Sequence, residues 1–171
     1  MSKPSDSNAH TGTHSRPVLT PRFLGPGEGE QVQVVTDLVR ILADTASTGG
    51  MCNIFESRTM PGGGPPLHRH SVDDEFFFIL HGRFEFVLDG RRFVADPGAF
   101  LVAPRGSTHT FTNAGSGPGR MLVITMPGGL DGPFREAATA VVPQAAPDPA
   151  VLGRIFGRHG IEFLGPPLGG H

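Results

Sequence analysis

Several kinds of residue and segment are scarce in this chain, and each scarcity excludes a class of protein. The single cysteine, Cys52, cannot form an internal disulfide. Its apolar neighbourhood predicts a buried thiol, and a lone cysteine favours a cytoplasmic location. No run of about eighteen apolar residues occurs, and residues 1–20 contain no apolar stretch typical of a secretion signal. Neither membrane insertion nor secretion is therefore indicated.

A surplus of positive charge is also lacking. The formal net charge is −2, and charges of both signs are interspersed along the chain. Binding to nucleic acid or to an anionic membrane needs a basic patch. We therefore expect neither nucleic acid nor a membrane as a partner.

Glycine, proline and phenylalanine are, by contrast, abundant. The 25 glycines and 17 prolines predict many tight turns, and the 13 phenylalanines supply every aromatic side chain because tryptophan and tyrosine are absent. A chain of 171 residues has the length of one ordinary domain. This composition favours a single all-β domain of short strands.

The chain divides into three parts. Residues 1–15 are polar and aperiodic, which predicts a disordered tail with solvated histidines. Residues 16–127 predict a β-barrel. Residues 128–171 predict a helical and loop extension packed on the barrel, with helices at 130–138 and 149–158 and Asp148 as an N-cap.

Nine short runs with apolar or alternating residues predict the strands of the barrel. They cover residues 31–35, 38–42, 51–57, 76–80, 84–88, 92–94, 100–103, 108–112 and 121–125. The clearest hairpin spans Phe84 to Val94, where Asp89 and Gly90 are suited to the two positive φ angles of a type I′ turn.

Three histidines and one glutamate form the most informative constellation. His68 and His70 are two residues apart, so on an extended strand both imidazoles project from one face. Glu75 follows at an odd spacing, so the polar stretch 71–74 has to turn the chain before Glu75 can join them. His109 lies on a later run as a distant fourth candidate. Exposed histidines, or core histidines satisfied by hydrogen bonds, remain the alternative at this point.

The wider spacing pattern resembles the two signature motifs of the cupin family. The first motif has Gly62, five residues, His68-Arg69-His70, four residues, Glu75, six residues and Gly82. The second has Gly98, five residues, Pro104-Arg105-Gly106, two residues, His109, three residues and Asn113. All ten fixed positions are occupied, far beyond what a Gly-, Pro- and His-rich composition produces by chance.

This resemblance, over about residues 30–127, implies an all-β fold, an antiparallel double-stranded jelly-roll barrel with short C-terminal helices. It also implies one divalent transition metal per chain, held by His68, His70, Glu75 and His109. Imidazoles with one carboxylate suit Fe, Mn, Ni, Co, Cu or Zn and disfavour Mg or Ca. The glycine-bounded turns and Asn113 are expected to be structural.

Secondary similarities extend to quercetinase-like monocupins. They include the approach to His68 at 63–67 and the segment 160–168. This resemblance implies a metal-dependent dioxygenase acting on a small enol or flavonol-like substrate. Glu75 would then be a ligand and the catalytic base, because metal-bound imidazoles keep no inward-facing basic nitrogen. A metal-dependent isomerase or lyase, or a non-catalytic cupin that binds a small molecule, is the alternative.

Residues outside this set have plainer interpretations. Arg69 and Arg105 flank the candidate ligands and either orient an anionic substrate or face solvent. Some of Phe77, Phe86, Phe100 and Phe111 are expected to face the interior, either packing it or lining a cavity. The opposite face of the 76–80 strand, with Phe76, Phe78 and Leu80, offers apolar surface and predicts a homodimer.

Overall fold

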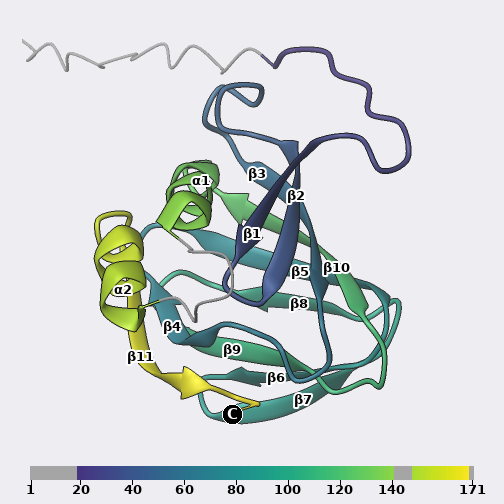
Figure 1. Ribbon diagram of the computed structural model, residues 1–171, viewed down its shortest axis with the longest axis vertical. Helices are drawn as coiled ribbons and strands as arrows, with labels where there is room; N and C mark the ends of the chain where they lie inside the picture. Colours follow the sequence, from purple (N-terminus) through teal and green to yellow (C-terminus); the bar gives the residue numbers. More distant parts are fainter. Residues whose placement is uncertain (1–18, 141–147, 170–171) are drawn as a thin grey trace, which may run out of the picture.

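The computed structural model describes residues 19–140 and 148–169. The predicted tail at 1–15, with His10 and His14, lies outside these residues. Two antiparallel sheets face each other and close into a barrel, and two short helices lie beside one end of it (Figure 1). This architecture confirms the predicted all-β jelly roll with short C-terminal helices. Within the described ranges, no helix has the length and apolar character needed to cross a membrane.

One sheet has the strand order β1-β2-β3-β10-β5-β8, and the other has the order β11-β4-β9-β6-β7. The strands of the first sheet are β1 (Glu30–Val34), β2 (Asp37–Ala43), β3 (Asn53–Thr59), β10 (Gly119–Met126), β5 (Asp74–His81) and β8 (Phe100–Ala103). Those of the second are β11 (Ile161–Pro167), β4 (Pro66–His70), β9 (Thr108–Asn113), β6 (Phe84–Leu88) and β7 (Arg91–Ala95).

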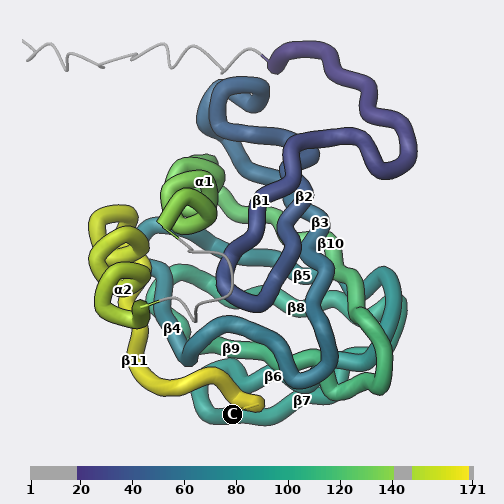
Figure 2. Tube along the Cα trace, in the orientation of Figure 1, coloured from purple at the N-terminus to yellow at the C-terminus, as the bar shows by residue number. Residues whose placement is uncertain are grey.

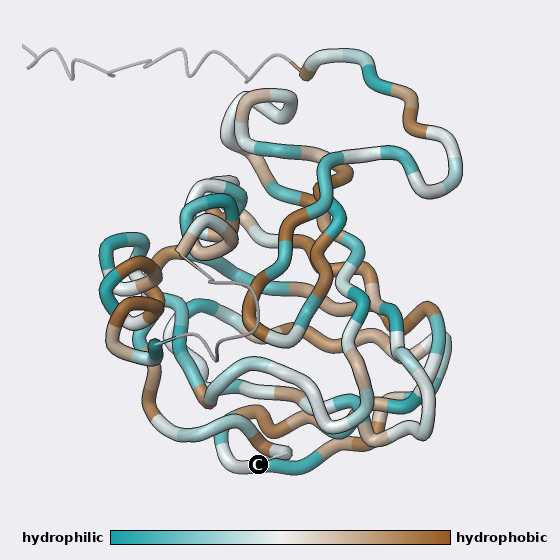
Figure 3. The backbone as a smooth tube through the Cα atoms, in the orientation of Figure 1, coloured by the Kyte–Doolittle hydropathy of each residue, from teal (hydrophilic) through white to brown (hydrophobic). Residues whose placement is uncertain are grey.

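Alternation along the strands places the core between the two sheets. In β3 and β10 every second residue is buried, as a sheet with one covered face requires. Phenylalanines from both sheets meet inside, with Phe77 and Phe86 ring centroids 5.2 Å apart. The hydropathy colouring shows the same alternation of apolar and polar segments (Figure 3). Phe100, one of four phenylalanines considered for the interior, instead points outward and is 59% exposed.

Local turn chemistry agrees with the sequence at the β6–β7 hairpin. Asp89 and Gly90 both have positive φ, 46° and 77°, as expected. The turn of the β1–β2 hairpin could not be predicted from the sequence in the same way. It places the β-branched Val35 at φ 53°, a conformation that such residues rarely adopt. Thr36 then accepts a hydrogen bond from the Gly64 backbone N–H at 3.2 Å, which fixes the hairpin tip to the loop before β4.

The C-terminal segment adds two helices and one strand. The helices are α1 (Asp131–Ala140) and α2 (Pro149–Gly157), and the Asp148 side chain caps α2 by accepting from the Ala150 N–H. Where the sequence predicted only helix and loop, residues 161–167 form β11, which pairs with β4 at the sheet edge. Figure 2 shows this last segment running from α2 past β4 toward the barrel's lower end. The boundary at 127/128 stays a prediction.

Cys52 departs from expectation. Its thiol is free and only half-buried, because it lies in the loop just before β3 and outside the core. The predicted strand at 51–57 accordingly starts later, at Asn53. Asn53 accepts hydrogen bonds from the Gly129 and Leu130 N–H groups, both at 2.8 Å, and this polar contact anchors the start of the C-terminal segment.

Candidate metal centre

Three of the four candidate residues come from two paired strands of one sheet. His68 and His70 project from the same face of β4, as their spacing predicted, and both are buried. His109 on β9 is the direct cross-strand partner of His68. Its ring centroid lies 4.2 Å from that of His68. Antiparallel pairing therefore brings together two motifs that lie far apart in the sequence.

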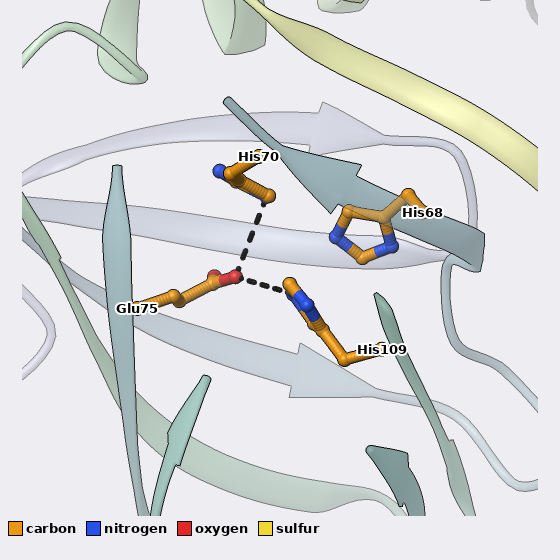
Figure 4. Close-up of side chains that lie close together, drawn as sticks. All are labelled: His68, His70, Glu75 and His109. Atoms are coloured by element: carbon orange, nitrogen blue, oxygen red, sulfur yellow. Dashed lines mark hydrogen bonds and ion pairs between the residues drawn. The ribbon is translucent and has the colours of Figure 1, made fainter. Parts of the chain in front are cut away.

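Glu75 reaches the same point from the opposite sheet. The turn at 71–73 redirects the chain, and its Ser71 N–H donates to the Gly160 carbonyl at 2.8 Å. Glu75 then points inward as the second residue of β5, together with Phe77 and Ile79. One nitrogen or oxygen from each of the four side chains lies within 4.8 Å of the others (Figure 4). The cluster thus lies between the sheets, inside the barrel.

Hydrogen bonds orient two of the imidazoles. His68 Nδ1 donates to the Pro66 carbonyl at 2.8 Å, and His70 Nδ1 donates to Asp73 Oδ2 at 3.2 Å. In each ring the other nitrogen, Nε2, is therefore available to bind a metal at the centre of the cluster. Such partners for the distal nitrogen are typical of metal-binding histidines. Sequence reasoning treated Asp73 as part of a turn, although an acidic residue three positions after His70 was a usable signal.

The electrostatics favour positive charge at the centre. Burial opposes ionisation of Glu75, but His70, His109 and His68 outweigh it and lower the pKa of Glu75 to about 2. Burial, with the charges of His109 and His70, lowers the pKa of His68 to about 3, so this ring is neutral. Burial alone would lower the pKa of His70 too, yet the Glu75 and Asp73 carboxylates raise it. A divalent cation would supply that positive charge without protonating a ligand.

The donor set fits a transition metal. Glu75 Oε2 lies 2.9 Å from His109 Nε2 and 3.5 Å from His70 Nε2, so one carboxylate oxygen is shared within the cluster. Among the described residues, His109 Nδ1 is buried without a hydrogen-bond partner, unlike the Nδ1 atoms of His68 and His70. Three imidazoles and a carboxylate suit the borderline metals, whose identity this geometry leaves open.

A cavity of about 100 Å³ adjoins the cluster. His68, His70 and Glu75 form part of its wall, and the rest is mainly apolar. Phe55, Phe77, Phe111, Phe134, Phe156 and Phe163 contribute six of its lining residues. This volume is well above the threshold of about 10–15 Å³ that a single water needs, so the space can hold several waters or a small organic molecule. The interior is therefore not packed solid.

The other sequence candidates lie away from the centre. Arg69 pairs with Glu162 at 2.5 Å, and Arg105 pairs with Asp74 at 2.6 Å, both at the surface. Neither arginine lines the cavity, and both side chains are exposed. Asn113 is structural, since its side-chain amide donates to the carbonyls of Thr59 and Gly117.

A jelly-roll barrel with this buried cluster defines the cupin class. The sequence profile of the family described as the cupin domain matches residues 55–125, which contain all four clustered residues. The chain belongs to the cupin superfamily and is quercetinase-like in sequence.

Two curated relatives match at 31% identity. The quercetin 2,3-dioxygenase of Bacillus subtilis (strain 168) matches over 119 residues, 69% of this chain and 35% of that protein. An uncharacterised protein of Methanocaldococcus jannaschii matches over 61 residues, 36% of this chain and 49% of that protein. The chain therefore spans less than half the length of either relative.

Solved structures share the fold at lower identity. KdgF from Halomonas sp. has a TM-score of 0.59 and 21% identity, covering 66% of this chain and 98% of that one. The polyketide cyclase RemF from Streptomyces resistomycificus has a TM-score of 0.55 and 24% identity, covering 63% and 80%. At these identities the likenesses show the fold alone.

Proposed function

We propose that this protein is a metal-dependent dioxygenase acting on a compact enol substrate. The observation that carries the proposal is the position of the cluster, where four buried metal-binding side chains meet the wall of an apolar cavity. The similarity to a quercetin 2,3-dioxygenase supports the reaction class. A cytoplasmic location belongs to the same proposal and rests on the lone cysteine.

The four side chains have distinct tasks in this proposal. His68, His70, Glu75 and His109 would hold one divalent transition metal, which when bound supplies Lewis-acid and redox chemistry toward O₂. Glu75 takes the proton from the substrate hydroxyl, because its carboxylate lies among the ligands and stays ionised at neutral pH. The phenylalanine walls exclude water and hold the flat apolar part of the substrate.

The size of the cavity bears on the substrate. Pockets that hold drug-sized ligands are typically about 300–1,000 Å³, whereas this cavity measures about 100 Å³. A single-ring or short enol fits that space better than a tricyclic flavonol does. The proposed substrate class is therefore smaller than quercetin.

Oxygen uptake by metal-loaded protein tests the proposal. Protein purified without an affinity tag is analysed for metal and then screened aerobically with single-ring hydroxyketones, β-diketones, enediols and flavonols. We expect O₂ consumption with one of the smaller enols and both atoms of labelled O₂ in the products. Turnover without O₂ consumption would instead establish the isomerase or lyase alternative, and binding without turnover a non-catalytic cupin.

A further inference from the structure

The cavity has a second polar region besides the metal cluster. It consists of Thr36, Asp37 and Ser57, which line the same cavity as His68 and Glu75. Asp37 Oδ1 accepts from the Thr36 hydroxyl at 3.3 Å, and Oδ2 accepts from the Ser57 hydroxyl at 3.2 Å. Within the described part of the chain, no arginine, lysine or histidine pairs with Asp37. A carboxylate without a countercharge in an apolar cavity is costly to keep.

The β1–β2 hairpin fixes the position of the Asp37 carboxylate in the cavity wall. Asp37 is the first residue of β2, directly after the hairpin turn in which Val35 has a positive φ. The bond from the Gly64 N–H to Thr36 holds the hairpin tip against the loop that leads into β4. Strained turns of this kind persist when surrounding contacts fix them, and they are frequent at ligand sites.

Apolar side chains separate the two polar regions. Both polar groups lie on the inner face of the larger sheet, in different cross-strand rows. Glu75 on β5 pairs with Thr125 on β10. Asp37 on β2 pairs with Thr59 on β3, which in turn pairs with Gly119 at the start of β10. The intervening row contains Phe77, Val123 and Phe55, all of which line the cavity. The cavity is therefore apolar in its middle, with metal donors on one side and Asp37 on the other.

Asp37 is an acceptor with spare capacity. Burial raises its pKa to about 6, an effect only partly offset by the hydroxyls of Thr59, Ser57 and Thr36. It is thus ionised at neutral pH, where a carboxylate offers about four acceptor sites. The hydroxyls of Thr59, Ser57 and Thr36 use at most three of these sites and leave room for a donor on a ligand.

We propose that Asp37 contacts the substrate and accepts a hydrogen bond from a hydroxyl remote from the oxygens that face the metal cluster. This inference rests on the proposed function. It narrows the substrate class to compact, mainly apolar enols with a hydroxyl at the far end of the molecule. The geometry that carries it is the juxtaposition of an unpaired carboxylate and the metal donors in one small cavity.

A matched pair of ligands tests this contact. Kojic acid and allomaltol are single-ring hydroxypyranones that chelate metals equally well, and they differ only in a hydroxymethyl group that replaces a methyl. Binding to full-length, nickel-loaded protein is measured anaerobically by calorimetry. A hydrogen bond to a charged group is stronger than one between neutral groups, so we expect kojic acid to bind the wild type at least about 10-fold more tightly. In Asp37→Ala the two affinities should become equal.

Two further variants keep the result interpretable. Glu56→Gln removes a carboxylate next to Ser57 that does not line the cavity, so it should keep the 10-fold preference. If Asp37→Ala does not fold, Asp37→Asn keeps the volume and should reduce the preference to about 3-fold or less. A wild type that binds neither compound would overturn the proposed enol class and this inference with it. Equal wild-type affinities, or a preference retained in the Asp37 variants, would overturn the role of Asp37 alone.

Discussion

At the scale of single residues, the surroundings of His70 decide what its ring does. Its Nδ1 is bound to the buried Asp73, so the ring cannot rotate without losing that bond, and Nε2 stays directed at Glu75. Asp74, the next residue, faces outward instead and pairs with Arg105. Two adjacent carboxylates thus have different roles, one orienting a metal-binding ring and one forming a surface ion pair.

Asp73→Asn should therefore weaken metal binding. The amide cannot stabilise the imidazole as the carboxylate does, and loss of such a partner typically costs 10–100-fold in metal affinity. Competition with a chromophoric chelator measures the affinity for Zn or Ni. Asp74→Asn is the matched control and should bind metal as the wild type does; equal affinities in both variants would show that Asp73 does not position His70.

Glu75→Gln separates metal binding from proton transfer. The substitution keeps the size of the side chain and a ligating oxygen but removes its charge and basicity. We expect the variant to retain most of its metal while turnover of the substrate found in the oxygen screen falls by about 10² or more, the usual scale for a general base. Metal analysis and oxygen uptake are compared with those of Glu162→Gln, a surface control. Full activity in Glu75→Gln would reduce Glu75 to a residue that shapes the turn before β5.

At the scale of elements, the loop before β4 sets the position of the site. Gly64 has φ 152°, and a Cβ there would lie 2.0 Å from the carbonyl oxygen of Phe111 on β9. The same residue donates to Thr36 at the hairpin tip. This loop therefore packs between two elements and delivers His68, four residues later, to its place beside His109.

Gly64→Ala is accordingly expected to destabilise the protein. Backbone strain of about 1–3 kcal/mol and overpacking of about 1–3 kcal/mol both apply, so unfolding free energy should fall by at least about 2 kcal/mol. Metal affinity should fall with it. Urea denaturation measures the change. Gly117→Ala is the control, because its Cβ would meet nothing within 4 Å; similar losses in both variants would contradict the close approach described for Gly64.

Local patterns explain which elements were predictable. The β6–β7 hairpin and the shared face of His68 and His70 follow from turn chemistry and a two-residue period, both visible in sequence. Strand β11 was missed because Gly165-Pro166-Pro167 interrupts that period, and its pairing with β4 is irregular after Phe163. Asp37 was missed for another reason: its place in the cavity wall follows a turn with a positive φ at Val35, which propensity does not predict for a β-branched residue.

At the scale of the whole molecule, the metal-binding cluster connects the two sheets of the barrel. The four clustered side chains come from β4, β5 and β9 and thus from both sheets. An unfolded chain cannot reproduce this arrangement, so a bound metal should stabilise only the folded state.

Metal addition should therefore raise the melting temperature. At 100 times the dissociation constant, binding contributes about 2.7 kcal/mol, and for a chain of this length each kcal/mol corresponds to about 2–4 °C. We expect an increase of about 5–10 °C when Ni, Fe, Mn or Zn is added to EDTA-treated protein, and about one metal ion per chain. The triple variant His68→Ala, His70→Ala, His109→Ala should show neither. No uptake and no shift in the wild type would make the metal assignment wrong.

The outer face of β5 and β8 has no cover within the described chain. Phe78 is 40% exposed, Leu80 38% and Phe100 59%, and the Phe76 and Phe100 rings stack with centroids 6.3 Å apart. Because β8 is also an edge strand, both its backbone edge and this apolar face are available to a partner. A second copy of the chain presents the same surface, so a two-fold contact covers both at once.

We therefore predict a homodimer formed through this face. Light scattering at micromolar concentration should give twice the chain mass of 18.0 kDa. Phe100→Glu places a charge in the middle of the apolar surface and should shift the protein to the monomer without lowering metal content, because Phe100 points away from the barrel interior. Val94→Glu, at an exposed site on the other sheet, is the control and should leave the dimer intact. A wild-type mass near that of one chain would mean that this apolar face is not a dimer interface.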